Sequence, residues 1–211
     1  MKVTSMALVV ASGLLLSACP ADDGGGKVLS SGLKIFMTSE LHVGDFAADP
    51  TLTGANGVEK ADDFCNRSAA KPNASTYKAL LVDGSLRDAV AKTDWVFKPN
   101  TAYYRPYNNV LIDTTNADAI FDVHWQAMDN SIADCNTEAC GYSGNYYAWT
   151  GMASTIDFSA GSEHCNAWGT GGTSGYGRLG GFSSTDDYAF VSSIIGSCSS
   201  SNRAYVYCVE Q

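Results

Sequence analysis

The cysteines are the residues of this chain whose type and number most clearly indicate chemistry. The 211 residues contain seven, of which Cys19 ends an apolar N-terminal stretch. The other six are Cys65, Cys135, Cys140, Cys165, Cys198 and Cys208. An even set predicts disulfides if the chain is exported, and six cysteines allow 15 pairings. Cys135 and Cys140 are near enough to close a small loop, whereas their spacing does not decide how the other four pair.

Neither a metal centre nor catalysis is indicated by the other reactive side chains. The chain has no Cys-x-x-Cys pair, and its three histidines, His42, His124 and His164, are scattered. It also lacks Gly-x-Ser-x-Gly, His-Glu-x-x-His and a P-loop, the short motifs of hydrolases, zinc peptidases and nucleotide-binding enzymes. We therefore expect no enzyme activity, no metal and no cofactor.

The N-terminus predicts export and a lipid anchor. Lys2 precedes an apolar stretch, residues 6–16, that is too short to span a bilayer and is typical of a signal peptide. The stretch ends in Leu16-Ser17-Ala18-Cys19, which resembles a bacterial lipobox. This resemblance implies cleavage before Cys19, diacylglycerol on its sulfur and an acyl chain, such as palmitate, on the new amine. Several acyl chains anchor a protein stably where a single chain does not. The alternative is an ordinary secretory peptide with an unmodified Cys19.

The anchor defines the expected organisation of the chain. Residues 1–18 are the expected signal peptide, and residues 19–32 form a polar, glycine-rich tether. Residues 33–211 remain for one domain. We expect the mature protein on the outer membrane or cell surface.

The composition limits the classes of partner. Hydrophobic residues make up 45% of the chain, enough for a sizeable core. Acidic residues outnumber basic ones by 22 to 13, for a net charge of −9. This balance lacks the positive surface that nucleic-acid binding requires, so we expect no nucleic-acid partner.

The pattern of apolar residues predicts an α+β domain. We expect strands at residues 33–39, 77–82, 147–152 and 202–209, an extended piece at 110–112, and helices at 56–70 and 85–92. Residues 41–52 and much of the glycine- and serine-rich stretch 169–201 are expected to be loop. The sequence thus predicts a compact domain with two short N-terminal helices, small twisted and mainly antiparallel sheets, and long loops.

Three of these elements carry specific expectations. Asn56 is a good N-cap for the first helix, with Glu59 three residues later as in a capping box. Helical spacing then places four residues on one inward face: Val58, Ala61, Cys65 and Ala69. In the second helix the expected apolar face is Leu86, Ala89 and Val90. Alternation in the last strand puts Ala204, Val206 and Cys208 on one face.

Aromatic residues beside an arginine are the candidate binding residues. Tyrosine, tryptophan and arginine dominate the energetics of many protein interfaces. The candidates lie in Gly- and Asn-rich, loop-like surroundings: Tyr103, Tyr104, Arg105, Tyr142 and Tyr146. Trp149 and Trp168 are instead expected in the core.

Several segments, in order, resemble endostatin, a variant of the C-type lectin-like fold. They are residues 52–65, 75–88, 148–151, 165–168, 177–181 and 205–210. Together with the lipobox, they make the chain similar to the leptospiral endostatin-like lipoproteins. The resemblance implies the nested disulfides Cys65–Cys208 and Cys165–Cys198, which leaves Cys135 and Cys140 as a local pair.

The resemblance also implies a function, though not every endostatin property. It implies an adhesin for host proteins such as laminin, fibronectin, plasminogen or complement factor H. Residues 27–33 contain no histidine for endostatin's zinc site, and the five arginines make a strong heparin site doubtful. The sugar-binding triplets of C-type lectins are absent, while Asp186 and Asp187 leave a weak calcium site open. The alternatives are a protein that binds carbohydrate or cell-envelope polymers, and a structural envelope lipoprotein without an external ligand.

Overall fold

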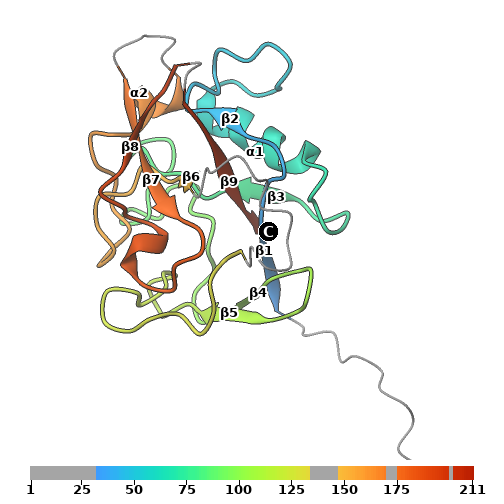
Figure 1. Ribbon diagram of the computed structural model, residues 1–211, viewed down its shortest axis with the longest axis vertical. Helices are drawn as coiled ribbons and strands as arrows, with labels where there is room; N and C mark the ends of the chain where they lie inside the picture. The colour runs from blue at the N-terminus through green and yellow to red at the C-terminus, as the bar shows by residue number, and fades with distance from the viewer. Residues whose placement is uncertain (1–31, 134–146, 170–174, 200–201) are drawn as a thin grey trace, which may run out of the picture.

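The computed structural model is a sheet-rich α+β domain with few and short helices (Figure 1). It describes residues 32–133, 147–169, 175–199 and 202–211. The expected signal peptide, Cys19 and most of the tether therefore lie outside the described residues. Within the described ranges, no helix is both long and apolar enough to cross a membrane.

The C-terminal strand β9 (Arg203–Glu210) is the centre of the sheet. It pairs in antiparallel fashion with β1 (Leu33–Met37), β2 (His42–Val43) and β3 (Tyr77–Ala79), and in parallel with β6 (Tyr147–Trp149). Its alternate residues are buried on both sides: Ala204, Val206 and Cys208 in one core cluster, and Tyr205, Tyr207 and Val209 in the other. The predicted apolar face is confirmed, and the opposite face is buried as well.

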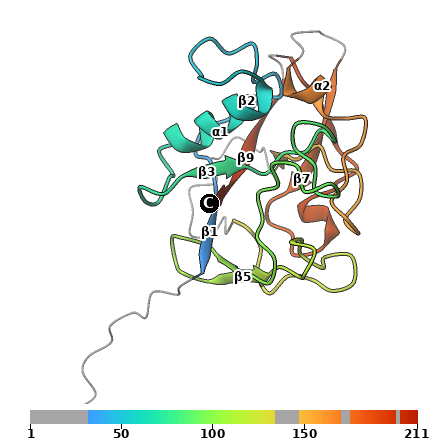
Figure 2. The ribbon, with the colours of Figure 1, turned by 180° about the vertical axis from the view of Figure 1, so that it is seen from behind.

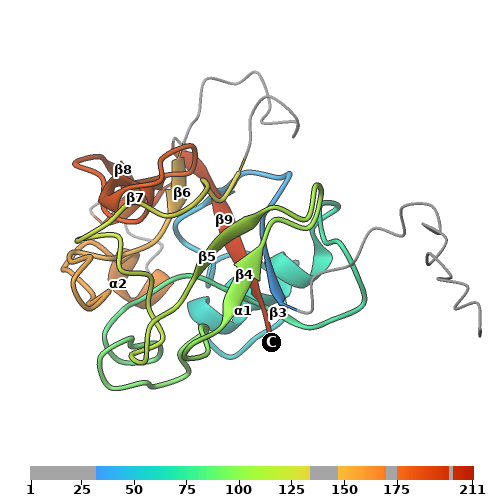
Figure 3. The same cartoon turned by 90° about the horizontal axis from the view of Figure 1, so that it is seen from below.

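Four more strands extend the sheet on the two sides of β9. On one side β4 (Ala102–Tyr104) lies parallel to β1 and forms a hairpin with β5 (Leu111–Thr114) at one end of the molecule (Figures 1 and 3). On the other side β7 (Tyr176–Gly181) and β8 (Ile195–Ser197) follow β6. The strand order is β5-β4-β1-β9-β6-β7-β8. The nine strands of the described residues therefore form one connected, mainly antiparallel sheet and not several small ones.

Strands β7 and β8 lie within residues 169–201, where most of the other described residues form the expected loop. The glycines of β7 allow other groups to approach the strand closely. A Cβ atom at Gly180 would lie 2.1 Å from the carbonyl oxygen of Ala189, and one at Gly177 would lie 2.7 Å from the Trp149 ring. The glycines of β7 therefore occur where other groups pack closely against a strand. Composition alone does not distinguish such a strand from a glycine-rich loop.

Helix α1 (Gly57–Arg67) is capped as predicted and runs beside β3 and β9 (Figure 2). The Asn56 side chain accepts the Glu59 backbone N–H at 2.9 Å, and the Glu59 carboxylate accepts the Ala55 N–H at 2.7 Å. Val58, Ala61 and Cys65 are buried as predicted.

The helix ends earlier than predicted, so that Ala69 is exposed. The Glu40 carboxylate accepts hydrogen bonds from the Ser68 hydroxyl at 2.6 Å and the Ala69 N–H at 3.1 Å. These bonds hold the chain in a turn after Arg67 and replace those that a continuing helix would make.

The predicted second helix is wrong: residues 85–92 form turns. A single carboxylate oxygen of Asp83 accepts the backbone N–H groups of Ser85, Leu86 and Arg87. A side chain that collects several amides in this way stabilises a turn in competition with a helix. Of the expected apolar face, Ala89 is buried, whereas Leu86 and Val90 are exposed.

Two further short helices occur late in the chain, α2 (Cys165–Trp168) and the 3-10 helix η1 (Asp187–Ala189). All four residues of α2 have left-handed φ values between +48° and +58°. Left-handed backbone is unfavourable for L-residues, so other contacts must hold this turn. The His164 ring nitrogen Nδ1 accepts the Ala167 N–H at 2.8 Å, and Cys165 is tied to Cys198 by a disulfide.

Two disulfides connect distant parts of the fold. Cys65 in α1 is bonded to Cys208 in β9, 143 residues away, and Cys165 to Cys198, 33 residues away. These are the nested pairs that the resemblance implied. Cys135 and Cys140 lie outside the described residues, so the third pair stays a prediction.

Candidate functional site

A pocket of about 330 Å³ lies between the start of α1, strand β3 and the turns that follow it. Its lining combines carboxylates, an amide, an ammonium group and two aliphatic side chains: Asn56, Val58, Glu59, Asp62, Lys78, Leu86 and Asp94. Helix α1 supplies Val58, Glu59 and Asp62 because residues three and four apart share one helix face. The pocket is therefore built largely on regular elements that fix its shape.

The fully buried side chain of Arg87 organises the charges around this pocket. Its guanidinium donates to both carboxylate oxygens of Asp62, at 2.9 and 2.8 Å, and to a carboxylate oxygen of Asp94. It also donates to the main-chain oxygens of Ala79 at 2.6 Å and Asp94 at 3.1 Å. Because a buried cation is costly unless it is paired and hydrogen-bonded, these contacts explain why the arginine is tolerated here.

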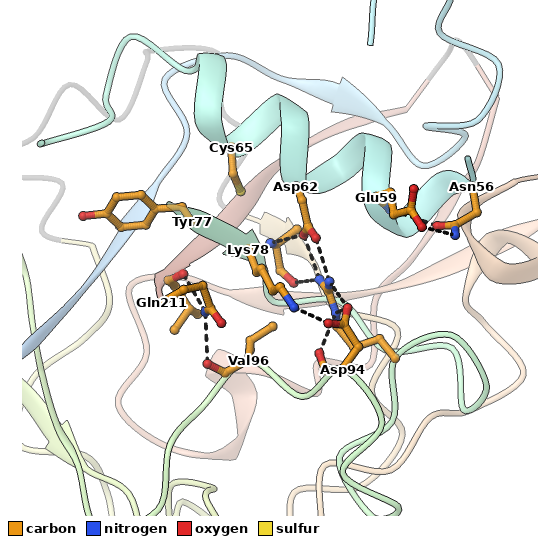
Figure 4. A network of polar contacts seen from close by, with 12 residues as sticks. Asn56, Glu59, Asp62, Cys65, Tyr77, Lys78, Asp94, Val96 and Gln211 are labelled. Carbon is orange, nitrogen blue, oxygen red and sulfur yellow. Dashed lines mark hydrogen bonds and ion pairs between the residues drawn. The ribbon is translucent and has the colours of Figure 1, made fainter. Parts of the chain in front are cut away.

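Asp94 is held between two cations. Figure 4 shows it facing Asp62, with Lys78 alongside. Partial burial acts to raise the pKa of Asp94, but the hydrogen bonds and charges of Lys78 and Arg87 outweigh it, so the pKa lies below its ordinary value. The carboxylate is thus kept ionised and fixed by ion pairs.

The carboxylates of the pocket are held by ion pairs and hydrogen bonds. The pocket lining contains no histidine, cysteine or serine. Asp62 and Asp94 are engaged by Arg87, and Glu59 accepts hydrogen bonds from Ala55 and from the Asn56 amide. The pocket offers a fixed pattern of charge beside the half-exposed Leu86 side chain. No group of three or more potential metal ligands occurs within the ranges that the structure describes.

The lowered pKa of Asp94 predicts a specific dependence of stability on pH. A carboxyl whose pKa is lower in the folded state stabilises the fold above its unfolded pKa, and this contribution is lost as the pH falls through the folded value. We expect the free energy of unfolding to fall less steeply between about pH 5 and 2.5 for Asp94→Asn than for the unmodified protein. Since the side chain is 37% exposed, screening by solvent limits the difference to about 1 kcal/mol or less.

Urea unfolding across this pH range measures the effect. The exposed Asp118→Asn serves as the matched control and should leave the slope almost unchanged. Equal slopes for Asp94→Asn and the unmodified protein would show that the ion pairs do not stabilise the ionised carboxyl.

The aromatic residues predicted to bind a ligand do not form one exposed group. Tyr103 is fully buried in β4; its hydroxyl accepts the Lys98 N–H at 2.8 Å, and burial raises its pKa to about 12. Its side chain is therefore unavailable to a ligand, which corrects the prediction. The reason is that residues 102–104 form a strand and not a loop, and alternation turns Tyr103 inward.

The other predicted binding residues have different surroundings. Tyr104 is half-buried, with the Lys34 ammonium group 5.0 Å from its ring centre, and Arg105 is almost completely buried. Tyr142 and Tyr146 lie outside the described residues. The binding role therefore stays a prediction for Tyr142 and Tyr146, and for Tyr104, whose side chain is only half-buried.

Trp125 is an exposed aromatic residue that sequence reasoning missed. Its side chain is 78% exposed, whereas Trp149 and Trp168 are fully buried as expected. The available signal was the number of polar residues around it, from Asp122 to Asn130.

The strands, the short helices and the two described disulfides define a small, sheet-rich α+β domain. Residues 49–185, more than half of the chain, match the family model described as "Protein of unknown function (DUF1554)". The chain belongs to this family. A comparison with curated proteins gives no match.

Proposed function

We propose that this protein is an exported, lipid-anchored adhesin whose single domain binds host extracellular-matrix or plasma proteins. The observation that carries the proposal is the pair of nested disulfides, which joins α1 to β9 and Cys165 to Cys198. This pairing is the one that an endostatin-like variant of the C-type lectin-like fold implies. We assign the domain to that fold on the disulfides together with the ordered sequence segments.

A binding role is favoured over catalysis by the chemistry of the pocket. Its carboxylates are engaged by Arg87, Lys78 or backbone amides, and its lining contains no serine, cysteine or histidine. Enzymes instead hold a nucleophile or a base within reach of the reacting atoms. A pocket with locked charges discriminates between ligands by shape and electrostatic complementarity.

The proposed anchor makes Cys19 essential for membrane attachment. We expect Cys19→Ser to move the protein from the detergent phase to the aqueous phase in Triton X-114 partitioning, because the thioether lipid can no longer form. Circular dichroism should be unchanged, since the substitution lies outside the domain. Retention of the variant in the detergent phase would contradict the lipid anchor.

The proposed function is tested with the lipid-free Cys19→Ser protein, its disulfides intact. Surface plasmon resonance should detect saturable binding to at least one of laminin, fibronectin, plasminogen and factor H, with no effect of EDTA. A reduced and alkylated sample serves as the control for folding. Binding to a glycan array but to none of these proteins would favour the carbohydrate alternative instead.

A further inference from the structure

Trp125 is held in an exposed position by a defined turn. Its backbone N–H and that of Gln126 both donate to the Asp122 carbonyl, at 2.9 and 3.1 Å. Just after this turn, the N–H of the buried Met128 donates to the Thr185 carbonyl at 2.7 Å. The turn that carries the indole is thus fixed to the body of the domain.

The exposure of Trp125 sets it apart from the other tryptophans. Trp149 and Trp168 are fully buried, and the partly buried Trp95 donates its indole N–H to the Ala119 carbonyl at 2.7 Å. The Trp125 ring instead meets the exposed His124 edge to face, with 4.6 Å between the ring centres. A large aromatic face in water is favourable for association, because its contact with a partner removes apolar area from solvent.

Carboxylates lie before and after this aromatic pair in the chain. Asp122 opens the turn, and Asp129 follows it. Asn130 donates its backbone N–H to Ile112 and its amide to Leu111, which places Asp129 beside β5 and Asp113. The pKa of Asp113 is raised by burial and further by the charges of Asp129 and Asp122, which agrees with a negative potential here.

Charge complementarity identifies the kind of partner. An indole face attracts ammonium and guanidinium groups, and flanking carboxylates strengthen that attraction. The chain as a whole carries a net charge of −9, so it attracts basic partners over longer distances as well. A neutral sugar would use the ring but would gain nothing from the surrounding charges.

We propose that the Trp125 surface, formed by Trp125, His124, Asp113, Asp122 and Asp129, docks a basic segment of a protein partner. An arginine or lysine of that segment stacks on the indole, and its neighbours pair with the carboxylates. This inference rests on the proposed protein-binding function, to which it adds the surface and the chemistry of the partner.

The test titrates fluorescein-labelled hexa-arginine with the lipid-free Cys19→Ser protein and follows fluorescence anisotropy. We expect saturable binding that weakens at least tenfold on Trp125→Ala. Because salt screens the carboxylates only in part, the loss on Trp125→Ala should persist at about 0.15 M salt. Tyr176→Ala, which removes another half-exposed ring, on strand β7, is the matched control and should bind normally.

Two outcomes overturn the inference. Equal affinity for Trp125→Ala and Tyr176→Ala would show non-specific attraction to an acidic protein. Protection of Trp125 from acrylamide quenching by maltohexaose, but not by hexa-arginine, would indicate a sugar platform.

The same variants separate this inference from the proposed function. A host protein that binds Trp125→Ala as tightly as the unmodified domain would refute the surface and leave the adhesin role intact. Specific hexa-arginine binding without any bound host protein would refute the adhesin role and leave the surface intact.

Discussion

Replacement of both Cys65 and Cys208 by alanine should lower the free energy of unfolding by about 5 kcal/mol, the loop-entropy value for a closure of this length. The bond closes a loop of 143 residues and connects α1 to the central strand β9. Without this disulfide the unfolded chain gains conformational freedom. In the folded protein both cysteine side chains are fully buried in the core. A loss of this size is a large part of the stability of an ordinary domain.

The second disulfide is the matched control. Replacement of Cys165 and Cys198 opens a loop of 33 residues, for which the same relation gives a loss of about 3–4 kcal/mol. Guanidinium titrations of the two double variants measure the difference. A smaller loss for the Cys65–Cys208 pair than for the Cys165–Cys198 pair would contradict its role as the main covalent tie.

Arg87→Met should cost about 3–5 kcal/mol, because one member of a buried ion-pair network is removed while its partners remain. Asp62 and Asp94 would then face each other without the cation between them, and the Ala79 carbonyl would lose its donor. Methionine preserves much of the side-chain volume, so the loss reports on charge and hydrogen bonding more than on a cavity.

Arg67→Met provides the comparison. Arg67 also pairs with an aspartate of α1, Asp63, at 2.8 Å, but its side chain is 49% exposed. An exposed pair of this kind contributes less than about 1 kcal/mol. Thermal unfolding of both variants should separate them clearly, and similar losses would mean that burial does not raise the contribution of Arg87.

Elements governed by local sequence were predictable. Asn56 and Glu59 mark the start of α1 because capping depends on neighbours in the chain. The alternation of Ala204, Val206 and Cys208 marks one face of β9 for the same local reason. The end of α1 was not predictable, since it depends on Glu40, a residue far away in sequence.

The candidate site depends almost entirely on long-range contacts. Arg87 would face solvent in the helix that local spacing predicted, but the Asp83 turn directs it into the core against Asp62 and Asp94. No local pattern links these three positions. Tyr103 was misplaced because a three-residue strand between loops gives too short an alternation to recognise.

Short, glycine-rich strands were hidden for a related reason. The residues of β7 fit because Trp149 and Ala189 approach their backbone, and that approach is visible only in three dimensions. The order of the segments along the chain nevertheless carried the resemblance from which the disulfide pairing was inferred.

The most direct test of the account is whether the domain faces the outside of the cell. Intact cells are treated with a membrane-impermeant biotin reagent that labels lysine amines, and a periplasmic protein is followed as the control for leakage. The account predicts that this protein is labelled in intact cells while the periplasmic control is not. Labelling only after the outer membrane is broken would exclude contact with host proteins and contradict the proposed adhesin.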